Sequence, residues 1–170
     1  MNQIDFRQDL LPLKDKIYRL ALRITLNRQE AEDLTQDTLL RAWDKRVELC
    51  AVQSLEAYCL TIVRRLALDR LALKEHANAS LTEAETQVPD AAGNPEERLV
   101  ATDRLQRVQR LFNALPVTLR TALQLRDIEG LSYHEAAEAM GITEGAFKVT
   151  LHRARTALRT QYEKIESYGL

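Results

Sequence analysis

Apolar side chains recur every three or four residues along most of this chain, and this spacing constrains the fold more than any other feature. The pattern runs through residues 10–24, 31–43 and 55–73, and it returns after residue 98. Residues three and four apart share one face of an α-helix. Leu, Ala, Arg, Glu and Gln are abundant, and only five Gly and four Pro interrupt the 170 residues. The sequence therefore predicts an all-α protein.

Charge divides the chain into three parts. Residues 1–77 carry a net charge of +1 and residues 98–170 a net charge of +3, whereas residues 78–97 carry five acidic and no basic side chains. This middle segment also has few large apolar groups, so it cannot bury enough surface to offset its ordering entropy. We predict two small helical domains, residues 1–77 and 98–170, joined by a flexible acidic linker at 78–97.

Cysteine and histidine positions argue against metal and disulfide chemistry. Cys50 and Cys59 are nine residues apart, which fits neither a disulfide scaffold nor zinc-ligand spacing, so two reduced thiols, buried or partly buried, are expected. The histidines (His76, His134 and His152) are scattered. With no glycine-rich phosphate loop or nucleophile elbow either, we expect no catalytic residue, no metal and no cofactor.

The N-terminus is polar and no run of about 18 apolar residues occurs, so neither a signal peptide nor a membrane-inserted segment is expected. A cytoplasmic location follows from this interpretation.

The strongest local signal is a helix-turn-helix between Ser132 and Arg159. Ser132 begins a capping box that opens a short helix, and Gly141 can adopt the positive φ that a tight turn favours. Thr143 can then cap a long final helix. A short helix, a tight turn and a second helix are what insertion into the DNA major groove requires.

The final helix has two distinct faces. Its apolar stripe consists of Phe147, Leu151, Ala154 and Leu158. The neighbouring polar face is cationic: Lys148, His152, Arg153, Arg155 and Arg159. Such a face is either an ordinary solvated surface or a DNA-binding surface, and the turn in front of it favours DNA binding.

Two stretches of the N-terminal half carry candidate binding residues. Residues 28–43 place acidic groups in the first half of a helix, which indicates either a solvated face or a protein-docking face. Residues 58–75 carry four cations that could guide a separated DNA strand: Arg64, Arg65, Arg70 and Lys74. Trp43 and Tyr58 could stack on bases or belong to the core.

Together these stretches resemble the extracytoplasmic-function (group IV) sigma factors of bacterial RNA polymerase. Residues 31–43, AEDLTQDTLLRAW, are similar to that family's core-polymerase-binding helix, and residues 57–71, AYCLTIVRRLALDRL, to its −10-reading helix. Residues 115–159 resemble its −35-reading domain. Three motifs in this order, separated by a variable linker, are far more specific than any one of them.

The resemblance implies a sigma factor that directs core RNA polymerase to promoter DNA and that has an anti-sigma partner. It implies polymerase contacts at Asp33, Gln36, Asp37, Leu40 and Arg41. It implies contacts with the −10 element at Arg64, Arg65, Arg70 and Lys74. It implies contacts with the −35 element at Ser132, Lys148, Val149, Thr150, His152, Arg153 and Arg155. The segment at 45–56, which breaks the helical pattern, would receive a base flipped out of the −10 element.

The chain departs from the family pattern at positions expected to contact promoter DNA. Arg65 stands where the family usually has Asn, and Val149-Thr150 where a Ser-Arg pair is common, so promoter preference is expected to differ.

Three other functions compete with this interpretation: a helix-turn-helix regulator without polymerase docking, a sigma mimic that sequesters an anti-sigma factor, and an enzyme. The first leaves 28–43 unexplained, the second should lack cations on its recognition helix, and the third lacks any catalytic motif.

Overall fold

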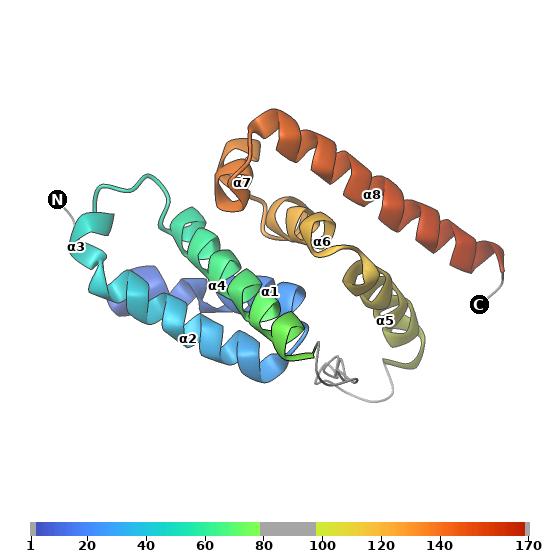
Figure 1. Cartoon of the computed structure of the whole chain (residues 1–170), viewed down its shortest axis with the longest axis horizontal. Coiled ribbons are helices and arrows are strands. Elements are labelled where there is room, and N and C mark those ends of the chain that lie inside the picture. The colour runs from blue at the N-terminus through green and yellow to red at the C-terminus, as the bar shows by residue number, and fades with distance from the viewer. Residues whose placement is uncertain (1–2, 79–97, 169–170) are drawn as a thin grey trace.

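The computed structural model describes residues 3–78 and 98–168, and within these ranges the chain is helical with no β-strand, which confirms the all-α prediction (Figure 1). The N-terminal half contains η1 (Phe6–Leu10), η2 (Leu11–Leu13), α1 (Lys14–Thr25), α2 (Arg28–Asp44), α3 (Arg46–Leu49) and α4 (Leu55–Asn78). The C-terminal half contains α5 (Arg98–Ala114), α6 (Val117–Leu123), η3 (Gln124–Ile128), α7 (Tyr133–Met140) and α8 (Glu144–Ser167).

Side-chain caps fix where several helices begin. The Asn27 side chain accepts a hydrogen bond from the Glu30 amide at 3.1 Å, which starts α2. Ser54 does the same for the Ala57 amide at 3.1 Å and starts α4. The segment at 45–56, which breaks the helical pattern in the sequence, therefore contains the four-residue helix α3 and includes the first two residues of α4.

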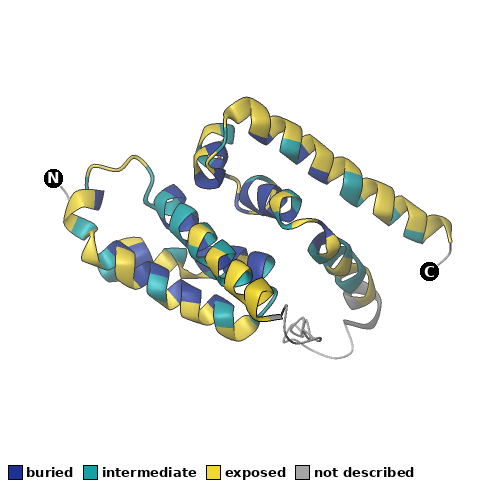
Figure 2. Ribbon diagram, viewed as in Figure 1, coloured by how far each residue is buried: buried dark blue, intermediate teal, exposed yellow. Residues whose placement is uncertain are grey.

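The N-terminal core forms where α1, α2 and α4 pack together. Its large side chains, all 0–1% exposed, are Leu10, Ile17, Leu20, Ile24, Leu34, Leu60 and Val63. In Figure 2 the buried faces of these helices turn toward one another, while the outer face of α2 is largely exposed. Apolar burial of this kind, about 1.5–3 kcal/mol for each large side chain, is the main force that holds the three helices together.

The acidic linker predicted at 78–97 lies outside the described residues, apart from Asn78, which is the last residue of α4. The domain boundaries therefore remain a prediction. The two halves of the described chain nevertheless touch: α1 packs against α6 and η3, and α4 packs against α7.

Arg120 of α6 forms the centre of this interdomain contact, and it is 9% exposed. Its Nε donates to the carbonyl of Arg23 at 2.7 Å and its Nη2 to the carbonyl of Ile24 at 2.8 Å, both at the end of α1. Its Nη1 donates to the Leu115 carbonyl at 2.9 Å within its own half. One guanidinium thus satisfies two carbonyls that the end of α1 leaves without an intrahelical partner.

Two further arginines of α1 reach across the same contact. Arg19 makes a bidentate ion pair with Glu129, at 2.7 and 2.9 Å, and the Glu129 side chain is 0% exposed. Arg23 donates to Gln124 at 3.0 Å and to Asn113 at 2.7 Å. Burial, followed by repulsion from Arg120, lowers the pKa of Arg23 to about 10.

The two cysteines are unpaired thiols, as the sequence predicts. Cys59 is buried in the N-terminal core, and this burial raises the pKa of its thiol to about 12. Cys50 is half-buried and donates to the Arg46 carbonyl at 3.3 Å. Within residues 3–78 and 98–168, no cluster of three or more His, Cys, Asp or Glu side chains could hold a metal ion. None of the helices described is long and apolar enough to cross a membrane.

Candidate nucleic-acid and polymerase-binding surfaces

The C-terminal half contains the predicted helix-turn-helix. Ser132 accepts from the Glu135 amide at 3.1 Å to start α7, and Thr143 accepts from the Ala146 amide at 3.1 Å to start α8. Between them Gly141 has φ +67°, a conformation that costs a residue with a Cβ roughly 1 kcal/mol or more. The sequence thus places both caps and the turn correctly.

The recognition helix α8 separates into a buried and an exposed face. Phe147, Leu151 and Ala154 are at most 2% exposed, whereas Leu158 at the end of the stripe is half-buried. Of the residues predicted to meet the −35 element, the exposed ones are Ser132, Lys148, Val149, His152, Arg153 and Arg155. Thr150 is half-buried, and its hydroxyl donates to the Ala146 carbonyl at 2.8 Å. Apart from Ser132, which caps α7, these side chains all lie on α8, whose outer face is largely exposed (Figure 2).

An ion pair that the sequence did not predict holds the Arg155 side chain. Arg155 makes a bidentate ion pair with Asp127 of η3, at 3.0 and 2.5 Å, and this hydrogen bonding raises the pKa of Arg155 further above its usual range. An arginine held by a carboxylate offers DNA less net charge than a solvated one. Lys148 and Arg153 are consequently the better candidates for the dominant phosphate or base contacts.

Tyr133 is another residue whose role in the helix-turn-helix was not predicted from the sequence. Its ring lies at 60° to Phe147, with centroids 6.3 Å apart, and Lys148 Nζ lies 5.2 Å from its centroid. The Arg126 guanidinium lies 4.5 Å from the same centroid. Cation–π contacts of this kind restrict the lysine near the start of α8, where it would reach the groove.

The residues predicted to meet the −10 element lie along α4 but differ in what they contact. Arg65 is exposed, whereas Arg64 is half-buried and donates to the Ala139 carbonyl of α7 at 3.3 Å. Arg70 is half-buried, and Lys74 pairs with Glu30 of α2 at 2.8 Å. The four cations therefore share one helix without forming one free cationic surface.

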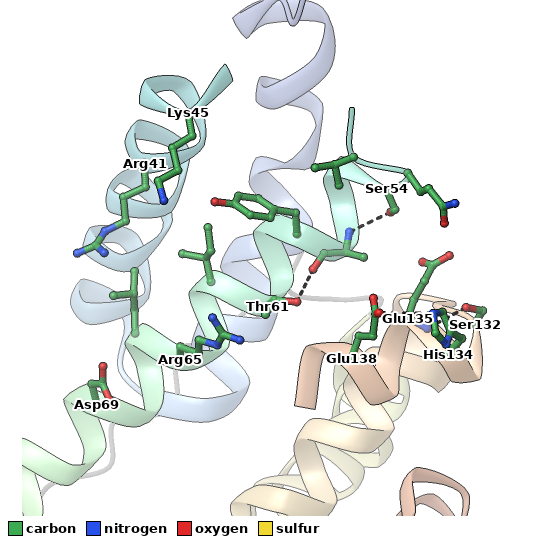
Figure 3. A pocket seen from close by; sticks show the side chains of 16 residues that line it. Arg41, Lys45, Ser54, Thr61, Arg65, Asp69, Ser132, His134, Glu135 and Glu138 are labelled. Carbon is green, nitrogen blue, oxygen red and sulfur yellow. Dashed lines mark hydrogen bonds and ion pairs between the residues drawn. The ribbon is translucent and has the colours of Figure 1, made fainter. Parts of the chain in front are cut away.

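An open cavity of about 1150 Å³ lies between α4 and α7 (Figure 3). Its N-terminal wall carries the cations Arg41, Lys45 and Arg65. Its other wall, on α7, carries Glu135 and Glu138. Tyr58, one of the aromatic candidates for base stacking, also lines the cavity, whereas Trp43 packs edge-on against Phe6 at 5.7 Å between ring centroids.

The predicted polymerase-binding residues share one side of α2. Asp33, Gln36, Leu40 and Arg41 are exposed, and Asp37 is half-buried and pairs with Arg41 at 3.2 Å. Leu40 is 60% exposed and adds an apolar side chain to this side of the helix. The opposite side of α2 is buried, because Leu34, Leu39 and Ala42 face the core. A fixed helix thus presents a mixed charged and apolar surface.

Two family models match the two halves of this architecture. Sigma-70 region 2 matches residues 12–76, which include α2 and nearly all of α4. Sigma-70 region 4 matches residues 105–158, which include the helix-turn-helix. The fold and its surfaces thus define a sigma-70-type transcription factor.

Similar proteins indicate which group of sigma-70 factors the chain resembles. The ECF RNA polymerase sigma factor SigE of Mycolicibacterium smegmatis is 33% identical over 154 residues, covering 90% of this chain and 60% of that protein. SigW of Bacillus subtilis, also an ECF sigma factor, is 31% identical over 156 residues, covering 87% of this chain and 83% of that protein. The chain belongs to the ECF RNA polymerase sigma factors, as the resemblance implied.

A solved structure shares the arrangement of the two helical halves. The sigma factor RpoE from Bartonella quintana, crystallised with the anti-sigma factor NepR, is 27% identical and superposes with a TM-score of 0.75. The match covers 94% of this chain and 97% of RpoE. Because it extends over both halves, RpoE in that complex holds its domains in a similar relative position.

Proposed function

We propose that this chain directs core RNA polymerase to specific promoters and initiates transcription. The N-terminal domain, residues 1–77, binds the polymerase and captures the −10 strand, while the C-terminal domain, residues 98–170, reads the −35 element. The observation that carries this proposal is the exposed cationic face of α8 behind a capped helix-turn-helix, in a chain whose other half matches sigma-70 region 2. Because transcription initiation takes place in the cytoplasm, we propose that location for the chain.

Contact with the −35 element is proposed for the exposed side of α8. Lys148 and Arg153 neutralise phosphates or reach guanine edges, and His152 lies beside them. Val149 is 50% exposed and offers an apolar surface to a thymine methyl group at a position where the family commonly has a polar residue. Ser132, Thr150 and Arg155 complete the proposed surface.

Capture of the −10 strand is proposed for α4 and the segment before it. Arg65 is exposed on α4, and Arg70 and Lys74 follow on the same helix. Cations that track the backbone, together with an aromatic platform, are how proteins hold single strands, and Tyr58 supplies the aromatic ring. The segment at 45–56 would receive the flipped base.

A protein partner is proposed from the structural relative. RpoE was crystallised with an anti-sigma factor, and we propose a partner of that class for this chain. ECF sigma factors act as regulators of RNA polymerase, so no catalytic role is proposed for any side chain.

Run-off transcription with purified core polymerase on a promoter library tests the proposed function. The expected result is transcripts that start at a defined subset of promoters only when the chain is added. A repressor would lower transcription without selecting new starts, and a decoy would change nothing. Either of these outcomes would refute the proposal.

Substituting Lys148→Ala or Arg153→Ala is expected to weaken binding to a −35 duplex by about 1–3 kcal/mol each where the side chain meets a base edge. The effect is measured by fluorescence anisotropy with the full-length chain, and each variant is checked by circular dichroism. Lys164→Ala is the matched control, because Lys164 is also exposed on α8 but lies near its far end. Wild-type affinity in both test variants would remove α8 from the interface.

A further inference from the structure

Three cations of the C-terminal half gather around one aromatic ring, that of Tyr133. Tyr133 is the first residue of α7, directly after the Ser132 cap, and it is half-buried. The Arg126 guanidinium of η3 lies 4.5 Å from its ring centroid, and Lys148 Nζ of α8 lies 5.2 Å from the same centroid. The third cation is Arg155 of α8, beside the phenol group. Because α7 packs against both η3 and α8, all three elements share this ring.

The two cations from α8 have partners of different chemistry. Arg155 is paired with the Asp127 carboxylate at 3.0 Å, so much of its charge is already balanced. Glu144 is one turn before Lys148 on α8, the spacing of a helical ion pair. Its carboxylate turns instead toward His134, with 3.3 Å between Oε1 and Nδ1. Within the described ranges the Lys148 ammonium therefore rests against a neutral ring rather than a carboxylate.

A neutral partner suits a lysine that must bind DNA. The negative face of an aromatic ring attracts an ammonium group without cancelling its charge, whereas a carboxylate would compete with the DNA phosphates. A lysine without a partner loses more side-chain entropy when it is immobilised on a ligand. Lys148 is exposed, so its N–H donors stay accessible while the ring contact is kept.

We infer that Tyr133 is a positioning residue for −35 recognition, which holds the Lys148 ammonium at the start of the recognition helix and leaves its full charge available to DNA. This inference rests on the proposed function. The ring acts through the lysine, from a backbone position that the Ser132 cap fixes. It is thus distinct from Arg155, whose partner is a carboxylate.

A double-mutant cycle on the full-length chain tests the inference, with affinity for a −35 duplex measured by fluorescence anisotropy. Tyr133→Leu should weaken binding by about two- to fivefold, the range of an exposed cation–π contact. In a Lys148→Ala background the same substitution should change affinity by less than about 1.5-fold, because the group that the ring positions is gone. Tyr133→Phe keeps the ring and should stay within about twofold of wild type.

The cycle separates positioning from packing. Tyr133 also packs edge-on against Phe147, with 6.3 Å between ring centroids, so Tyr133→Leu removes some stability as well. A loss that came from stability alone would be equal in the two backgrounds. Tyr162→Leu is the matched control, because Tyr162 is also half-buried but lies near the far end of α8, where its hydroxyl donates to Glu166 at 2.8 Å. This control should bind as wild type does.

A second measurement needs no DNA. The ring current of Tyr133 should shift the side-chain proton resonances of Lys148 in the NMR spectrum of the free chain. Tyr133→Leu should remove that shift, while Tyr133→Phe should retain it.

Each contrary outcome has a distinct meaning. Equal losses in both backgrounds would overturn the positioning role and leave Tyr133 a packing residue. Tighter binding by Tyr133→Leu would also overturn it, since the ring would then compete with DNA for the lysine. A wild-type chain that bound the −35 duplex no better than a scrambled duplex would overturn the proposed function, and the Lys148 resonances would still decide whether the ring holds the ammonium.

Discussion

Asp37→Arg is expected to abolish association with core RNA polymerase and to reduce run-off transcription by about a hundredfold or more, a loss of roughly 3 kcal/mol in binding. Asp37 lies centrally on the side of α2 proposed to dock, and it pairs with Arg41 at 3.2 Å. The substitution removes this pair and places two cations one turn apart, so the charge of the surface is reversed. Loss on this scale is typical of a charge reversal at an interface centre.

The measurement is co-purification with core polymerase, with circular dichroism as the test of folding. Asp103→Arg is the matched control, because Asp103 also makes an exposed pair with an arginine four residues later, Arg107 at 3.9 Å, but lies on α5 in the other half of the chain. The control should co-purify as wild type does. Unchanged co-purification of Asp37→Arg would refute the docking surface on α2.

Phe147→Ala is expected to destabilise the C-terminal half by about 3–5 kcal/mol, which is most of the stability of a small domain. Phe147 is 0% exposed and is among the largest fully buried side chains described. Its removal leaves a cavity between α8 and α7 and ends the edge contact with Tyr133. Because Tyr133 restricts Lys148, −35 binding should be lost together with stability.

Urea denaturation, followed by helical signal, measures this effect. Val149→Ala is the control, since Val149 lies two residues further along α8 and is 50% exposed, so its change in stability should stay within about 0.5 kcal/mol. A loss under about 1 kcal/mol for Phe147→Ala would contradict the packing of the helix-turn-helix.

The sequence predicted the helices and their starts because those depend on neighbours along the chain. Ser132 and Thr143 cap the helices that they were expected to cap. Each cap is a bond between residues three apart, and each apolar stripe repeats within a few turns. Local chemistry of this kind is visible in a single sequence.

What the sequence did not predict depends on residues that are distant along the chain. Arg19 and Glu129 are 110 positions apart, and nothing in either local pattern indicates the pair. Arg155 looked like one of several free cations until η3 brought Asp127 beside it. The π-helical turns η1 and η3 were also missed, since apolar spacing does not distinguish them from α-helix.

The unequal burial of the two thiols gives the native chain a single reactive position. Thiolate is the form that attacks alkylating reagents, so Cys59, with its pKa raised to about 12, should remain unmodified at neutral pH. A maleimide dye should then attach at Cys50, inside the segment proposed to receive the flipped base. Promoter melting would be observable as a change in emission from a protein that carries no substitution.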